Sequence, residues 1–141
     1  MSTEQLTTSK ILIVAFLTTL VSAIVNIIIF MIGDIFRAFD GFEAPQPDGS
    51  TAALTIFVPP ISTFAFMVIG TIGFFILYKG LKVDLTRIRI IAIIVLILSF
   101  VLPLTVSGAP ISAVILLELM HVTTGLIVIP NLTGDKLYSK F

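Results

Sequence analysis

The sequence has no cysteine, one histidine and few charges: Lys, Arg, Asp and Glu together make up 11% of its 141 residues. Without cysteine the chain forms no disulfide, has no thiol redox chemistry and cannot hold an iron–sulfur cluster. The formal net charge is zero and the charges lie in a few short segments. The chain therefore offers no basic face for a nucleic acid.

Apolar residues dominate the sequence. They make up 57% of it, and the mean hydropathy is +1.20, whereas soluble domains average about 45–50% apolar residues. This composition is typical of an integral membrane protein, so we expect the lipid bilayer as its partner. The length leaves room for one domain.

Four apolar stretches are long enough to cross a hydrocarbon core of about 30 Å. We place them near residues 11–32, 53–78, 88–106 and 111–130. The short turn at residues 107–110 makes the last two antiparallel neighbours. The sequence therefore predicts an all-α fold, a four-transmembrane-helix antiparallel bundle. A cleavable signal peptide ending near Ala23 is disfavoured, because the first apolar run continues through Met31.

The charges orient the bundle. Residues 79–89 contain four basic residues and one acid, whereas residues 34–51 contain one basic residue and four acids. Cytoplasmic loops of membrane proteins are enriched in Lys and Arg. We therefore expect a cytoplasmic loop at 79–87 and an outer loop at 34–51. Lys10, Lys136 and Lys140 put both termini on the cytoplasmic side of the cell (plasma) membrane.

An acid and an imidazole lie three residues apart in the fourth span, at Glu118 and His121. Placing a carboxylate in hydrocarbon costs roughly 2.5–3.5 kcal/mol on insertion scales, so such a residue indicates a functional site. A rise of about 1.5 Å per residue puts Glu118, Asn26, Ser62 and Ser99 at depths of roughly 10–14 Å from the outer ends of their helices.

The faces of the helices on which these polar residues lie agree with their depths. Thr19, Ser22 and Asn26 share one side of the first span, and Glu118, His121 and Gly125 share one side of the fourth. We expect both stripes to turn inward around a polar, outward-facing pocket. Its mouth would be the helix break at Pro59 and Pro60 and the loop phenylalanines Phe36, Phe39 and Phe42, which would share one side of a helical turn.

Several roles for this pocket stay open. Glu118 and His121 would have a purely structural role if they only tied helices together by hydrogen bonds. A Glu-x-x-His pair also suits a di-metal site, but no other Glu or His lies in a span to complete it. A single His can ligate haem. A carboxyl beside an imidazole can exchange a proton near neutral pH, which suits transport, reception of a cationic amphiphile, or acid–base catalysis.

Short motifs along the chain resemble those of a known family. They are Leu98-Ser99-Phe100-Val101-Leu102-Pro103, Leu119-Met120-His121-Val122 and Val25-Asn26-Ile27-Ile28, with the early prolines of the second span. In these the chain resembles an uncharacterised bacterial family of small four-helix membrane proteins, described as a domain of unknown function. The resemblance implies a four-span fold and a prokaryotic membrane, and no activity.

We expect the protein to bind or transport a small amphiphilic or cationic molecule at Asn26, Ser62, Ser99, Glu118 and His121, with proton coupling compatible with the pair. The alternative is a non-catalytic accessory or structural subunit of a larger membrane complex. No cofactor and no metal are expected, and an enzyme is disfavoured because no nucleophile motif is present. A homo-oligomer is compatible with both functions.

Overall fold

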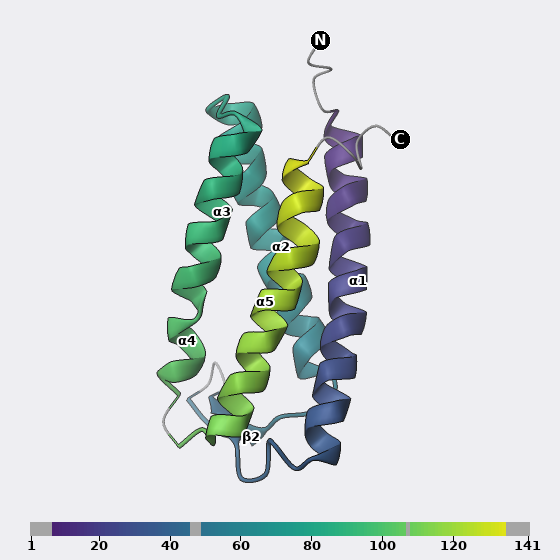
Figure 1. Cartoon of the computed structure of the whole chain (residues 1–141). Helices are drawn as coiled ribbons and strands as arrows, with labels where there is room; N and C mark the ends of the chain where they lie inside the picture. The colour runs from purple at the N-terminus through teal and green to yellow at the C-terminus, as the bar shows by residue number, and fades with distance from the viewer. Residues whose placement is uncertain (1–6, 46–48, 107, 135–141) are drawn as a thin grey trace.

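The computed structural model describes residues 7–45, 49–106 and 108–134. Long helices alternate in direction, and the first of them begins at the same end of the bundle at which the last one ends (Figure 1). A short two-stranded hairpin lies at the other end. The elements are α1 (Thr8–Ile35), β1 (Glu43–Pro45), β2 (Thr51–Ala53), α2 (Val58–Phe75), the π-helix η1 (Ile76–Gly80), α3 (Leu85–Ser99), α4 (Val101–Leu104) and α5 (Ile111–Thr133).

The predicted all-α, four-span bundle is confirmed. Four helical segments are long and apolar enough to cross a membrane: Thr8–Ile35, Val58–Gly80, Leu85–Leu104 and Ile111–Thr133. The second joins α2 to η1 and the third joins α3 to α4. Of the charges that orient the chain, Asp48, Lys136 and Lys140 lie outside the described residues.

The prolines set where helices begin and break. The second helix starts at Val58, five residues after the predicted position, with Pro59 and Pro60 in its first turn. First-turn N–H groups have no helical acceptor, so proline costs little there and starts the helix without kinking it. Pro103 supplies no N–H for the carbonyl of Ser99. The third span is accordingly interrupted at Phe100, between α3 and α4.

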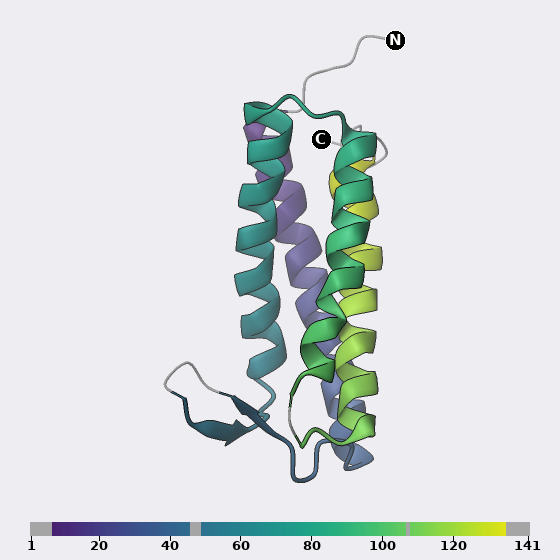
Figure 2. The same cartoon turned by 90° about the vertical axis from the view of Figure 1, so that its left-hand side faces the viewer.

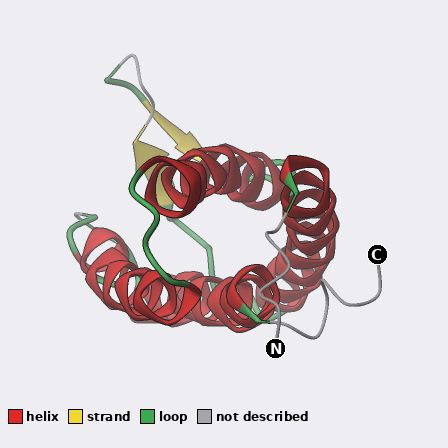
Figure 3. Cartoon of the chain, turned by 90° about the horizontal axis from the view of Figure 1, so that it is seen from above, coloured by secondary structure: helices red, strands yellow, loops and turns green. Residues whose placement is uncertain are grey.

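The order in which the helices pack differs from their order in the chain. α2 packs on α1, α1 on α5, and α5 on α3. α2 and α3 are consecutive in the chain, yet they stand apart with α1 visible between them (Figure 2). Seen from above, they lie on opposite sides of the opening that the helices surround (Figure 3). α2 and α3 are therefore not neighbours in the packing of the bundle.

Two apolar clusters hold the bundle, and α1 contributes to both. The predicted inward turn of its polar stripe is confirmed, since Thr19, Ser22 and Asn26 are all buried. α3 buries only Ile88. The cluster near the chain ends contains Ile11, Val14, Ala15, Met67, Phe74, Ile88 and Leu132. The cluster near the hairpin contains Phe30, Phe39, Phe42, Ala113 and Met120.

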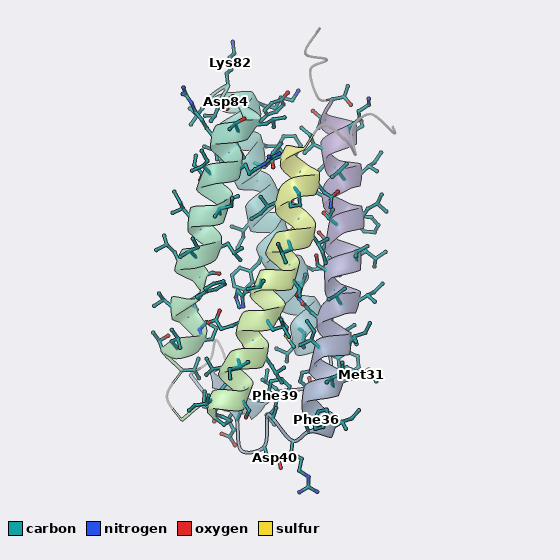
Figure 4. The ribbon with its side chains drawn as sticks, in the orientation of Figure 1. Met31, Phe36, Phe39, Asp40, Lys82 and Asp84 are labelled. Atoms are coloured by element: carbon teal, nitrogen blue, oxygen red, sulfur yellow. The ribbon has the colours of Figure 1, made fainter. Side chains whose placement is uncertain are left out.

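Residues 36–42 close the hairpin end of the bundle. The Phe39 ring stacks on Phe30 with 5.0 Å between centroids. The Ser112 hydroxyl in the first turn of α5 donates to the Ala38 carbonyl at 2.8 Å. Phe36, Phe39 and Asp40 lie at this end, and Lys82 and Asp84 at the other (Figure 4). The loop thereby fixes α5 against the end of α1.

Candidate functional site: a cleft between α2 and α3

A cleft of about 450 Å³ lies between α2 and α3, with α1 and α5 forming its floor. Most of its lining is apolar, including Phe66, Met67, Ile69, Val95, Leu96 and Val128. The lining runs along α2 from Val58 to Gly70 and along α5 from Leu117 to Ile129. Twelve residues of helix rise about 18 Å, so the cleft is long and narrow. Its polar side chains are Asn26, Ser62, Thr63, Ser99, His121 and Thr124.

Asn26 connects three helices at the floor of the cleft. Its side-chain amide donates to the Thr63 hydroxyl of α2 at 2.9 Å and to the Thr124 hydroxyl of α5 at 3.1 Å. Thr63 in turn donates to the Pro59 carbonyl at 2.7 Å. Both amide hydrogens are thus used within the protein. Asn26 is a structural junction beneath the cleft, and its amide N–H groups are not free to bind a ligand.

His121 lines the cleft from α5. Its Nδ1 lies 2.7 Å from the Leu117 carbonyl oxygen. A carbonyl only accepts, so the ring proton of a neutral imidazole bound this way is on Nδ1. Nε2 of this cleft-lining residue is then a hydrogen-bond acceptor.

Ser62 and Ser99 face the cleft from its two sides, Ser62 on α2 and Ser99 on α3. The Ser99 hydroxyl donates to the Leu96 carbonyl at 2.6 Å. Its oxygen keeps lone pairs that accept a further hydrogen bond. Together with His121, these serines give the cleft hydrogen-bonding groups on three helices.

Glu118 lies outside the lining of the cleft. Both of its carboxyl oxygens are buried without a hydrogen-bond partner in the described part of the chain. Gly125, two turns later on the same face of α5, sits against the Leu96 side chain of α3. Gly125 and Leu96 both line the cleft, so helical spacing does not place Glu118 on a face of α5 away from it. Of Glu118 and His121, only His121 lines the cleft.

The expected mouth residues are divided among different positions. Pro59 lines the cleft and Pro60 does not. Phe39 and Phe42 are buried in the apolar cluster near the hairpin, whereas Phe36 is 78% exposed. They do not share one side, because Arg37, at a φ of 56°, turns the chain directly after Phe36. Phe30, Leu54 and Val58 line the cleft near this end instead.

Sequence reasoning missed Thr63 and Thr124. Thr124 lies one turn after His121 and Thr63 one turn after Pro59, so helical spacing would have placed both on the correct faces. Among the described residues, no group of three or more His, Asp or Glu side chains comes together to hold a metal ion.

These features define a class: a small four-helix membrane protein with a half-open apolar cleft and a few hydrogen-bonding groups inside it. Residues 6–136 match a family model described as a family of unknown function, DUF6069. The chain belongs to this family. No curated protein matches the chain, and no solved structure matches it.

Proposed function

We propose that the protein binds a small amphiphilic molecule in the cleft between α2 and α3. The observation that carries the proposal is the lining: apolar side chains from both helices with Ser62, Ser99 and His121 among them. Ligand sites commonly have volumes of about 300–1,000 Å³ and combine apolar walls with a few polar groups. The charge distribution of the loops supports a cleft in the outer half of the bilayer.

Two glycines of α2 allow a matched test. A Cβ added at Gly70 or at Gly73 would meet nothing within 4 Å, but only Gly70 lines the cleft. Gly70→Leu should fill the cleft without disturbing the fold, and Gly73→Leu is the control with the same gain in helix propensity. Amphiphiles retained by each purified protein are measured by native mass spectrometry.

The proposal expects Gly70→Leu to lose bound amphiphile while Gly73→Leu and the unaltered protein retain it equally. Equal retention by all three would show that bound molecules lie elsewhere on the helices, and would overturn the proposal. Transport is a separate step, because a carrier must release its ligand on both sides. Flux of the retained molecule into protein-containing vesicles tests it.

Proton coupling is the part of the proposal that involves Glu118. Its buried carboxyl oxygens have no hydrogen-bond partner among the described residues, and it lies one turn before His121. In this proposal a change of charge at Glu118 shifts α5 against α3 and so alters the cleft. Any change in amphiphile binding by the unaltered protein between pH 5 and pH 8 should then be smaller in Glu118→Gln, because glutamine has no charge to gain or lose. An unchanged pH dependence would leave Glu118 with a structural role.

The second candidate, an accessory subunit, is supported by α3. Most of its apolar side chains are exposed, including Ile94, Ile97 and Leu98. In this case α3 would pack on another membrane protein, or on a second copy of this chain, instead of on lipid. Cysteine crosslinking from Ile94→Cys in native membranes would give a defined larger product. Crosslinks to many abundant membrane proteins, without one product of defined mass, would count against this candidate.

A further inference from the structure

We propose that the ligand of the cleft is a neutral lipid that carries a hydroxyl group and enters sideways from one leaflet, between α2 and α3. This inference rests on the proposed function and specifies its ligand. It follows from three properties of the cleft: where it opens, how long it is, and which hydrogen-bonding groups it presents.

The rim of the cleft is apolar and exposed. Phe66 on α2, Ile69 on α2 and Val95 on α3 all line it, and their exposed fractions are 62%, 65% and 58%. These side chains lie within helices that are apolar enough to cross a membrane. The opening therefore faces hydrocarbon, and a molecule already dissolved in the bilayer reaches the cleft without crossing water.

The length of the cleft matches one leaflet. From Val58 to Gly70 the lined part of α2 rises about 18 Å, and half of a hydrocarbon core is about 15 Å. The end of the cleft at Leu54 and Val58 is next to the β1–β2 hairpin. A single hydrocarbon chain from the leaflet on the hairpin side would fill the cleft lengthwise.

Among the described residues, no Asp, Glu, Lys or Arg lines the cleft. A charged group of either sign would lose its hydration there and find no opposite charge, which is costly in a low-dielectric site. His121 offers an acceptor at Nε2, because Nδ1 is bonded to the Leu117 carbonyl. Ser62, on the α2 side of the cleft, can donate and accept. A ligand hydroxyl satisfies both, since it donates to Nε2 and accepts from Ser62.

The only histidine in the sequence makes this testable by nitrogen-15 NMR, because histidine labelling produces the signals of one imidazole. The protein is held in nanodiscs and titrated with hexadecanol, hexadecanoate, hexadecylamine or hexadecane. Hexadecanol should shift the Nε2 resonance of His121 and bind at least about tenfold more tightly than the two charged probes, a difference of about 1.4 kcal/mol. Ser62→Ala should weaken hexadecanol binding severalfold and leave hexadecane binding unchanged.

The Gly70→Leu protein separates the two levels of the proposal. Suppose that Gly70→Leu binds none of the probes, while the unaltered protein binds a charged probe as tightly as hexadecanol. The cleft is then a binding site, and the hydroxyl assignment is wrong. If hexadecanol shifts the Nε2 resonance equally in Gly70→Leu and in the unaltered protein, the cleft is not the binding site and both proposals fail.

Discussion

Single polar residues in this bundle act by joining helices. Asn26 is the clearest case, because one amide group bonds α1 to Thr63 of α2 and to Thr124 of α5. In hydrocarbon no water is available to hydrogen-bond such a group, so its protein partners determine which helices pack together. The junction lies beneath the cleft and holds its two floor helices in place.

A double-mutant cycle measures the strength of this junction. Asn26→Leu and Thr63→Val should each destabilise the protein, with a coupling energy of roughly 0.6 kcal/mol and at most about 1.7 kcal/mol, the range found for hydrogen bonds between membrane helices. Thr18→Val is the control, because the Thr18 hydroxyl donates to Val14 and Ala15 of its own helix. Unfolding in mixed micelles gives the free energies. Equal coupling of Asn26 to Thr18 and to Thr63 would contradict the junction.

Gly33 lets α1 approach its neighbours closely. A Cβ added there would overlap the Leu116 side chain and lie 2.7 Å from Cε2 of the Phe39 ring. We expect Gly33→Ala to cost about 1–3 kcal/mol of stability, as overpacking does in other cores. Gly73→Ala, which has open space around it, should be neutral or stabilising by up to about 1 kcal/mol. Thermal unfolding of the two variants compares them, and equal stability would be the contrary result.

At the residue scale the sequence predicted that Asn26 and His121 line the pocket, because polar groups are rare in the spans. It did not predict that His121 lines the cleft and Glu118 does not. Their separation of three residues leaves about 60° between them around the helix axis, within one broad face. Which of the two lines a cleft is decided by the position of α3 relative to α5, and that position depends on tertiary packing around Gly125 and Leu96.

Among the helices, α5 is held at its end by a residue of α3. The Arg89 guanidinium donates from Nε to the Thr133 hydroxyl at 2.9 Å and from Nη2 to the Thr133 carbonyl at 2.8 Å. A cation at a helix C-terminus also opposes the negative end of the helix dipole. This contact fixes α3, which buries only Ile88 among its own side chains.

Replacing Arg89 should loosen the last turn of α5. Lysine carries the charge but cannot reproduce the two-donor fork of the guanidinium. We therefore expect Arg89→Lys to speed amide hydrogen exchange at residue 129 and at residues 131–133 by about tenfold, which is about 1.4 kcal/mol. Arg87→Lys is the matched control, because Arg87 pairs with Asp84 at an exposed site, where ion pairs contribute little. Unchanged exchange in Arg89→Lys would show that Arg89 does not hold the helix end.

Helix existence and direction were predictable at the element scale, because long apolar runs admit few alternatives in a membrane. The residues at which helices begin and break were not predictable. Pro59 and Pro60 are equally consistent with a kink inside a helix and with its first turn. Residues 51–53 pair with residues 43–45 as a strand, so the helix begins only at Val58 and the prolines lie in its first turn. The side-by-side placement of Phe36, Phe39 and Phe42 assumed a helix where Arg37 and Gly41 instead have positive φ.

For the whole molecule the main feature is the opening between α2 and α3. Helices joined by a short loop commonly pack together, as the sequence led us to expect of the third and fourth spans. Here α2 and α3 each pack on a different floor helix, α2 on α1 and α3 on α5. The cleft is a consequence of this arrangement, which no pattern in the sequence records.

The orientation of the whole molecule remains a prediction from charge. Because the chain has no native cysteine, single cysteines can report it: Phe36→Cys near the hairpin end and Leu81→Cys at the other end, where the native side chains are 78% and 66% exposed. An impermeant maleimide added to intact cells should label Phe36→Cys, and should label Leu81→Cys only after the membrane is opened. The reverse pattern would invert the topology.

The central claim is that a hydrocarbon chain lies between α2 and α3, and photocrosslinking tests it most directly. A diazirine-bearing long-chain alcohol is photolysed with the protein in nanodiscs, and its insertion sites are mapped by mass spectrometry. We predict insertion at Ser62, Phe66 and Val95, which line the cleft, and its loss with excess hexadecanol. Insertion spread equally over Ile61, Val68 and Ile72, which are exposed but outside the lining, and not reduced by hexadecanol, would contradict the claim.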